Sequence, residues 1–331
     1  MKLPYKKEIE DELRLFFKQI KKDVKFPEVL GALDKLEDYT MRGGKRIRAI
    51  LIVVGYLACG GKNIKEIVKV STSAELLQSF LLIHDDIIDE DDLRRGGSTV
   101  HASFRQKYNQ RISESLAMIT GDLSICYTLE PVLNSSFSDS LKLEAIREIM
   151  NTTKTTCFGQ ILDEYGELKE VDEKFVESIQ INKTANYTIA KPLVLGAKLA
   201  GASNEVIEGL SEFGLSLGRA FQIRDDILGV FGDEKKLGKP VGSDLVEGKK
   251  TLLIIRANSK FINSMIGKDL NEKEIEKIRE IIISSGSLYY SKKLIEELIE
   301  KAKKALDKVN IKSEQKKFLM EIADYIGKRE N

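Results

Sequence analysis

The stretch HDDIIDEDDLRRGG, residues 84–97, carries a run of carboxylates and two arginines directly after an apolar segment. The residues just before it, AELLQSFLLIH, are strongly apolar, and their spacing predicts a buried helix over 63–90 that ends in acidic side chains. A helix brings Asp85, Asp86 and Asp89 to one face, because they lie three and four residues apart. Like charges at that spacing repel, so the pattern favours a bound cation over the simpler alternative of a solvated acidic helix end.

A second acidic pair, Asp225 and Asp226, follows an apolar helix in FQIRDDILGVFGDEKKLGKP, residues 221–240. Mg²⁺ takes carboxylate oxygens together with substrate phosphates, and arginine and lysine bind the remaining phosphate charge. The two acidic motifs therefore predict a diphosphate site above a cavity with apolar walls. The basic residues beside the motifs are Lys45, Arg46, Arg48, Arg94, Arg95, Lys183, Lys239, Lys249 and Lys250.

Composition narrows the class of protein. The 331 residues include 53 Lys and Arg against 52 Asp and Glu, a balance that argues against a nucleic acid partner. The three cysteines lack metal-ligand spacing, which is typical of reduced thiols rather than of a disulfide framework. The longest apolar run, residues 49–59, is shorter than the roughly 20 residues of a membrane-spanning helix, and the N-terminus lacks a signal-peptide pattern. We therefore expect a soluble cytoplasmic protein without a transmembrane segment.

Apolar residues recur at three- and four-residue steps along most of the chain, and β-hairpin signals are missing. This pattern predicts one all-α domain over 1–331, a single large bundle of long helices around a central cavity. Asn63 and Ser203 are expected to cap helix N-termini, and Gly60 and Gly201 to end helices. Helices are predicted over about 5–24, 44–59, 63–90, 111–137, 138–165, 172–201 and 203–231, with further helical spacing around 294–299 and 318–326.

Five ordered blocks carry a family resemblance. They are GGKRIR at 43–48, the first acidic motif with RRG, GQILDEYGE at 159–167, NKTA at 182–185, and FQIRDDILG at 221–229 followed by GKPVGSDLVEGKKT. With these blocks, the chain resembles the trans-isoprenyl diphosphate synthases, also called polyprenyl synthetases. More narrowly, it resembles the archaeal short-chain enzymes that make farnesyl or geranylgeranyl diphosphate. The resemblance implies an all-α fold, usually assembled as a homodimer.

The resemblance also implies roles for individual positions. It implies three Mg²⁺ ions per active site, with Mn²⁺ as the alternative metal, held by Asp85, Asp86, Asp89, Asp225 and Asp226. The implied isopentenyl diphosphate ligands, which act without metal, are Lys45, Arg48, Gln78 and Arg95. The implied allylic diphosphate site contains Arg94, Lys183, Thr184, Gln222, Lys239 and Lys249, with Gln160 and Asp163 supporting it.

The implied reaction is a condensation of isopentenyl diphosphate with dimethylallyl, geranyl or farnesyl diphosphate. The allylic diphosphate ionises, the isopentenyl double bond attacks the cation, and a proton is lost. Phe80 and Leu81 are expected to form the cavity floor, which favours the C20 product, all-trans geranylgeranyl diphosphate. A farnesyl (C15) or mixed C15/C20 synthase is the alternative, and a non-catalytic subunit of a heteromeric prenyl synthase and a terpene cyclase are weaker ones.

Three positions depart from the family pattern. Ala49 and Ser98 stand where proline is common, which affects local backbone rigidity. Gly229 stands where many relatives have a third carboxylate in the second acidic motif. The number of metal ions at that motif is therefore left open.

Overall fold

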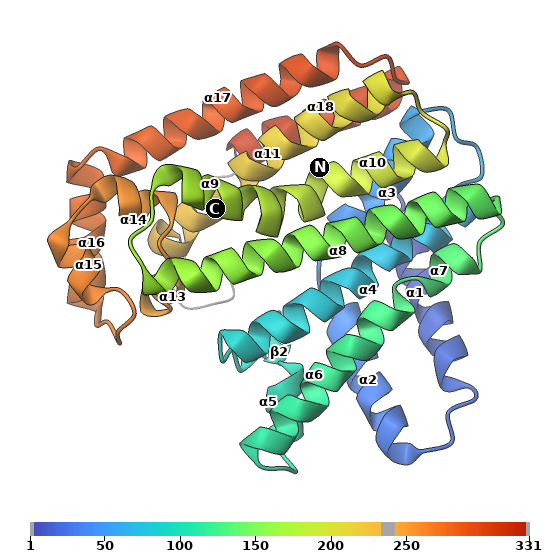
Figure 1. Cartoon of the computed structure of the whole chain (residues 1–331), viewed down its shortest axis with the longest axis horizontal. Coiled ribbons are helices and arrows are strands. Elements are labelled where there is room, and N and C mark those ends of the chain that lie inside the picture. Colours follow the sequence, from blue (N-terminus) through green and yellow to red (C-terminus); the bar gives the residue numbers. More distant parts are fainter. Residues whose placement is uncertain (1–2, 233–241, 329–331) are drawn as a thin grey trace. The chain divides into compact units, whose positions relative to one another are not determined.

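The computed structural model describes residues 3–232 and 242–328, so Lys239, a predicted phosphate ligand, lies outside the described residues. Within these ranges nearly all regular structure is helical (Figure 1). The strands of the described chain form one short antiparallel hairpin, β1 (Leu93–Arg94) with β2 (Gly97–Ser98). The all-α prediction is confirmed.

The described chain forms two compact units. The N-terminal unit comprises Lys2–Glu148 and Leu195–Gly201, and the C-terminal unit comprises Ile149–Val194 and Ala202–Asn331. The helices α8 (Asp139–Leu168) and α10 (Lys191–Leu199) each contribute residues to both units. The single domain expected over 1–331 stays a prediction.

The N-terminal unit is organised around α4 (Ile64–Ile88), which packs against α3 and α6. Because α4 is apolar on most of its circumference, it is stable only where neighbours cover it, and its buried residues run from Ile67 to Asp86. The core beside it includes the fully buried Leu36 and Leu76. The other helices of this unit are α1 (Lys6–Lys21), α2 (Pro27–Met41), α3 (Ile47–Ala58), α5 (Val100–Arg105), α6 (Gln110–Tyr127) and α7 (Glu130–Leu133).

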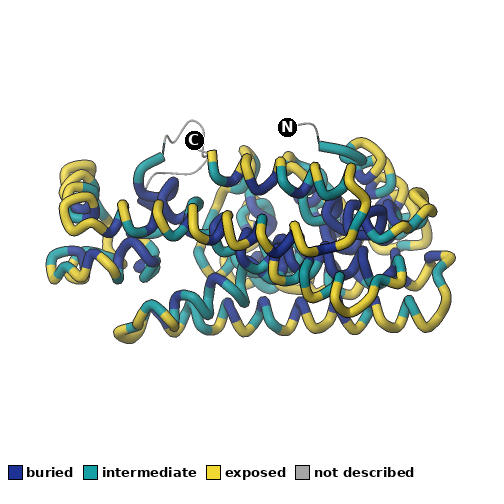
Figure 2. The backbone as a smooth tube through the Cα atoms, turned by 90° about the horizontal axis from the view of Figure 1, so that it is seen from above, coloured by how far each residue is buried: buried dark blue, intermediate teal, exposed yellow. Residues whose placement is uncertain are grey.

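The C-terminal unit is organised around α11 (Asn204–Phe231), which packs against α17 and against the π-helical segment η1 (Gln180–Ala190). Glycines make the close approach to η1: a Cβ at Gly218 would lie 2.5 Å from the Ala185 Cα. Figure 2 shows buried and exposed residues alternating along the long helices, as amphipathic helices require. The remaining elements are α9 (Glu173–Ile179), α13 (Ser243–Val246), α14 (Leu252–Ala257), α15 (Lys260–Met265), α16 (Glu272–Ser284), α17 (Ser287–Asp307) and α18 (Ser313–Lys328).

Most predicted helices are found, with local differences at their ends. The Asn63 side chain accepts a hydrogen bond from the Glu66 N–H at 3.3 Å, which confirms it as an N-cap. Gly60 and Gly201 adopt φ values of 90° and 73°, in the left-handed region that ends helices. Ser203 does precede α11, but its side chain makes no capping bond to the backbone.

Several segments differ from the prediction, including the short helices α5 and α13–α16, which were not predicted. The helix expected over 172–201 consists of α9, η1 and α10; Pro192 lacks the N–H that an α-helix needs there, and the wider π-helical turn comes just before it. The helix expected over 111–137 ends at Tyr127, and α7 follows as a separate turn. The helix α2 was not predicted, although Pro27 at its first position is a common helix start.

One stretch of the described chain, Gln110–Leu133, is long and apolar enough to cross a membrane by length and composition. It includes α6, which buries Ala117 and Gly121 and packs against α4. Core helices of soluble proteins pass the same test, so a single such stretch is weak support for a membrane span.

Candidate active site

Asp86 of the first acidic motif is completely buried in the N-terminal unit. The Tyr39 hydroxyl donates to its Oδ2 at 2.5 Å, and the Arg94 Nε donates to its Oδ1. Burial raises the pKa of Asp86 to about 6, although the charge of Arg94 and the hydrogen bond from Tyr39 act to lower it. Asp86 is thus a carboxylate held in a fixed orientation by two donors.

Arg94 brings positive charge to several carboxylates of the same motif. Its guanidinium lies 3.7 Å from the Asp85 carboxylate and 3.0 Å from that of Asp91, in addition to its contact with Asp86. Asp89 ends α4, where its backbone N–H donates to the Asp85 carbonyl at 2.8 Å. Arg94 therefore offsets part of the negative charge of the first acidic motif.

The hairpin after α4 sets the directions of the two arginines. Arg94 pairs with Gly97 across the hairpin, and the two residues between them, Arg95 and Gly96, have φ values of 53° and 74°. Positive φ at both central positions is the geometry of a type I′ turn, which matches the twist of a two-stranded hairpin. The left-handed backbone at Arg95 is a strained conformation for a residue with a side chain.

A cationic cluster lies beside the first acidic motif in the same unit. The Gln78 amide oxygen, turned toward the guanidinium groups, accepts from Arg95 Nη2 at 2.9 Å and from Arg48 Nη1 at 3.2 Å. A Cβ at Gly44 would lie 3.4 Å from Arg95 Nη1, so the glycine loop packs directly on this arginine. The structure brings together Arg48, Gln78 and Arg95, and the fourth predicted residue, Lys45, lies in the adjoining loop.

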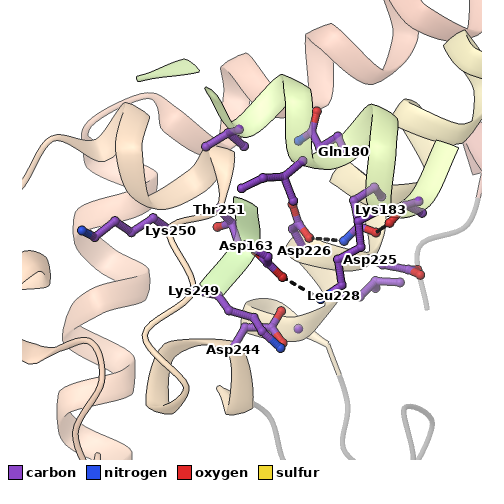
Figure 3. A pocket seen from close by; sticks show the side chains of 15 residues that line it. Asp163, Gln180, Lys183, Asp225, Asp226, Leu228, Asp244, Lys249, Lys250 and Thr251 are labelled. Carbon is purple, nitrogen blue, oxygen red and sulfur yellow. Dashed lines mark hydrogen bonds and ion pairs between the residues drawn. The ribbon is translucent and has the colours of Figure 1, made fainter. Parts of the chain in front are cut away.

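A pocket of about 360 Å³ opens in the C-terminal unit (Figure 3). The Thr184 hydroxyl donates to Gln222 Oε1 at 2.6 Å, and the Gln222 amide donates to Asp226 Oδ1 at 2.7 Å. Lys183 Nζ donates to Asp163 Oδ2 at 2.6 Å. The polar residues that line the pocket are Asp163, Gln180, Lys183, Thr184, Gln222, Asp225, Asp226, Asp244, Lys249, Lys250 and Thr251.

Negative charge is concentrated in this pocket. Burial raises the pKa of Asp226 well above its ordinary value, and the carboxylates of Asp244, Asp225 and Asp163 raise it further, against the hydrogen bond from Gln222. The neighbouring carboxylates disfavour the ionised form of Asp226. A cation bound among them would stabilise that ionised form.

The oxygen ligands of both motifs suit a hard cation. Within residues 3–232 and 242–328, no group of three or more His, Cys, Asp or Glu side chains is arranged as a complete metal centre. Mg²⁺ does not need one, because it commonly binds one or two carboxylates and completes its shell with water and substrate phosphates. The buried Asp86 and Asp226 fit that pattern.

Comparison with known proteins supplies the family. A model of the polyprenyl synthetase family matches residues 31–282. The chain belongs to the polyprenyl synthetase family. It is 35% identical over 293 residues to a geranylgeranyl diphosphate synthase of Methanosarcina mazei, covering 87% of this chain and 86% of that one. It is also 34% identical over 314 residues to a short chain isoprenyl diphosphate synthase of Methanothermobacter thermautotrophicus, covering 92% of each.

Solved structures agree with this assignment. The fold matches that of a Corynebacterium glutamicum geranylgeranyl pyrophosphate synthase, solved in complex with isoprenyl diphosphate and magnesium. The TM-score is 0.92 and the identity 32%, over 99% of this chain and 100% of the other. The family inferred from the sequence blocks is confirmed, and with it the class of trans-prenyltransferases.

Arg46 of the polyprenyl synthetase chain corrects one sequence interpretation. The sequence places it among the basic residues beside the acidic motifs, but Arg46 is buried and its side chain is 1% exposed. It donates to the Thr40 carbonyl at 2.8 Å, the Met41 carbonyl at 3.0 Å and Glu75 Oε2 at 2.9 Å. With φ at 55°, it holds the glycine loop in a left-handed turn rather than binding an anion.

Asp244 is a site residue that the sequence reasoning missed. Its Oδ2 lies 2.7 Å from the point where a Cβ at Gly229 would be, beside the second acidic motif. The third carboxylate at this motif therefore comes from a later segment of the chain. Its position inside the block GKPVGSDLVEGKKT was the available signal.

Other predicted residues lie at varying distances from the pocket. The Gln160 amide donates to Glu164 at 2.9 Å, and Gln160 is not among the residues that line the pocket. Lys249 pairs with Glu247, whereas Lys250 donates to the Lys169 carbonyl at 2.5 Å and extends away from the acidic side chains (Figure 3). The preference for Lys249 over Lys250 stays a prediction.

Proposed function

We propose that this protein condenses isopentenyl diphosphate with dimethylallyl, geranyl or farnesyl diphosphate and releases all-trans geranylgeranyl diphosphate (C20). The observation that carries the proposal is the cluster of Arg48, Gln78 and Arg95, a cationic group in the N-terminal unit that shares no residue with the acidic pocket of the C-terminal unit. A condensing enzyme needs such a second diphosphate site, whereas a terpene cyclase does not. The named geranylgeranyl diphosphate synthase relatives support the product.

The allylic diphosphate is assigned to the cationic side chains nearest the acidic motifs. In the proposal, Arg94 and Lys183 bind its phosphate oxygens together with Lys249, and each is already adjacent to a carboxylate. Bound metal supplies Lewis-acid stabilisation of the leaving diphosphate; we propose three Mg²⁺ ions, with Mn²⁺ as the alternative metal. The metal ligands proposed are Asp85, Asp86, Asp89, Asp225 and Asp226.

The side chains then act on the developing charges. Cationic groups stabilise the negative charge that grows on the diphosphate as the C1–O bond breaks. The Gln222 amide is held on both sides, by Thr184 and Asp226; in the proposal, its dipole stabilises the allylic cation. The isopentenyl double bond forms the new carbon–carbon bond, and the released diphosphate accepts the proton.

A closed apolar cavity protects the cation from water. We propose that Phe80 and Leu81 of α4, five and four residues before Asp85, form its floor. With a rise of about 1.5 Å per residue, the floor lies about 7 Å along the helix from the carboxylates. A floor at that depth limits how many isoprene units the product contains.

We also propose a homodimer, supported by an apolar stripe on α8. Met150, Phe158, Ile161, Tyr165 and Leu168 are all exposed, and their spacing places them on one face of the helix. Exposed apolar stripes of this kind mark protein interfaces. Light scattering is expected to report a dimer, and Ile161→Glu to yield monomer; Lys174→Glu, at an exposed polar position, is the control. A monomer in the parent protein would contradict this part of the proposal.

The cellular location is proposed as cytoplasmic. Cys59, Cys126 and Cys157 carry free thiols, as expected of a protein in a reducing compartment.

The first experiment is a product assay. The protein is incubated with isopentenyl diphosphate, Mg²⁺ and each allylic primer in turn, and chain length is measured after dephosphorylation. A C20 product supports the proposal in full. A C15 or mixed product retains the enzyme class and overturns the product. Failure to condense any primer would reject the catalytic proposal and favour a non-catalytic subunit.

A further inference from the structure

Phe80 contacts another ring on the same helix. The ring centroids of Phe80 and His84, one turn apart on α4, are 4.7 Å from each other, with an angle of 58° between the planes. Tilted aromatic pairs at this separation are attractive beyond simple burial. The orientation of the Phe80 ring therefore depends on where the His84 ring is held.

His84 is in turn attached to the neighbouring helix α6. Its Nε2 lies 3.2 Å from the Met118 carbonyl oxygen, within hydrogen-bond distance, and 3.5 Å from the Asp122 carboxylate. The bond to Met118 requires the tautomer with a proton on Nε2. The ring is thus held by α6 at Nε2 and packs against Phe80 in a tilted arrangement.

Gly121 provides the space for this arrangement. A Cβ at this position would lie 2.5 Å from His84 Cδ2 and 2.6 Å from His84 Nε2, closer than any real contact. The imidazole therefore lies directly on the backbone of α6, between the turns that carry Met118 and Asp122. No larger residue fits at position 121 without displacing His84.

The Met118 carbonyl does not need the hydrogen bond from His84, because it has another partner. Met118 lies inside α6, where its carbonyl already accepts the N–H four residues later, so removal of His84 leaves no buried acceptor unpaired. The fold therefore does not require the bond between His84 and the Met118 carbonyl, and that bond holds a ring that contacts the predicted floor residue Phe80.

From this geometry we propose that His84, held by α6, is a positioning residue that sets product length by fixing the orientation of the Phe80 ring. The inference rests on the proposed function, because it assumes that Phe80 forms the floor. When His84 is lost, Phe80 regains rotamers that the stacked ring excludes. The floor then yields to a longer chain, and the product distribution shifts upward.

The test compares product lengths in four variants. Phe80→Ala establishes whether Phe80 is the floor. His84→Gln retains a donor for the Met118 carbonyl but removes the ring, and Gly121→Ala leaves the ring but displaces it. His101→Ala is the matched control, because His101 is a buried histidine of the same unit that contacts Thr99 and Asp92 instead.

The fraction of product longer than that of the parent enzyme is expected to rise severalfold in His84→Gln and in Gly121→Ala. His101→Ala is expected to lower thermal stability without changing the distribution. The Mg²⁺ concentration for half-maximal rate is measured in each variant, and it should stay unchanged in His84→Gln if the effect does not pass through the neighbouring Asp85.

The outcomes separate the two proposals. If Phe80→Ala does not lengthen the product, the proposed floor is wrong, and the role of His84 is rejected with it. If Phe80→Ala lengthens the product while His84→Gln and Gly121→Ala do not, the role of His84 is rejected and the synthase proposal stands. If either of these two variants fails to fold, the other decides the question.

Discussion

The carboxylate of Asp244 fills the space beside Gly229 that any larger residue would need. Its Oδ2 lies 2.7 Å from the expected Cβ position, and the Gly242 N–H donates to the Gly229 carbonyl at 2.8 Å. The segment that carries Asp244 is therefore attached to α11 at the very residue where the acidic motif lacks a carboxylate. A glycine at position 229 leaves room for Asp244, which supplies the third carboxylate from a later segment of the chain.

Gly229→Ala is expected to displace Asp244 and to lower kcat/KM for the allylic substrate. A misplacement of about 1 Å near reacting groups can reduce the rate by up to about a hundredfold. Steady-state kinetics at saturating Mg²⁺ measure the effect. Gly166→Ala is the control, since a Cβ there meets only ordinary contacts with Phe175 and Ile179, the nearest at 3.5 Å. Equal activity in the two variants would contradict the prediction.

Arg95→Met is expected to raise the KM for isopentenyl diphosphate selectively. Loss of one charged hydrogen bond to a phosphate corresponds to about 1.5–3 kcal/mol, which is about a tenfold to hundredfold change in affinity. The KM for the allylic primer should change little, because Arg94 remains on the acidic motif. Arg14→Met, at an exposed position paired with Asp11, is the control. A parallel rise in both KM values would argue against a separate isopentenyl site.

The buried pair of Arg46 and Glu75 is expected to stabilise the glycine loop. Arg46→Met leaves Glu75, which is 2% exposed, as a buried charge without its partner. Removal of one member of a buried ion pair typically costs about 3–5 kcal/mol of unfolding free energy. Chemical denaturation of the single variants and of the double variant Arg46→Met/Glu75→Gln measures the coupling. The double variant is expected to recover part of the unfolding free energy that the single variants lose. A loss in the double variant equal to the sum of the two single losses would contradict the prediction.

Asp86 is expected to make the stability of the metal-free protein depend on pH. Its pKa in the folded protein is raised to about 6, above about 4 in the unfolded chain. The folded state therefore binds the proton more tightly, and this contribution to stability is complete below about pH 4 and lost as the pH rises through about 6. Asp86→Asn, which cannot titrate, isolates the effect.

Denaturation in EDTA at several pH values between 4.5 and 7.5 provides the measurement. The stability of Asp86→Asn relative to the parent protein should increase with pH, by up to about 3 kcal/mol for a shift of roughly two pKa units. A difference that stays constant with pH would show that Asp86 does not titrate in this range.

Local sequence patterns were sufficient for much of the fold. The helices α4 and α11 follow from apolar spacing and from their end signals, because a helix is defined by contacts three and four residues apart. The acidic motifs and the arginines beside them were also noted from the sequence pattern, whereas Gln78 was implied only by the family resemblance; the roles of these residues stay predictions. The hairpin itself was not predicted, because its turn residues Arg95 and Gly96 are not a usual type I′ pair.

The amino-acid sequence by itself determined the all-α class, the two acidic motifs and the family to which the chain belongs. Only the tertiary structure decided that Arg46 turns inward to Glu75, that Asp244 lies beside Gly229, and that His84 rests on Gly121. Each of these pairs joins residues on different elements, and nothing in the local spacing records the contact. Such relationships arise only when the elements pack, because packing decides which side chains share one small volume.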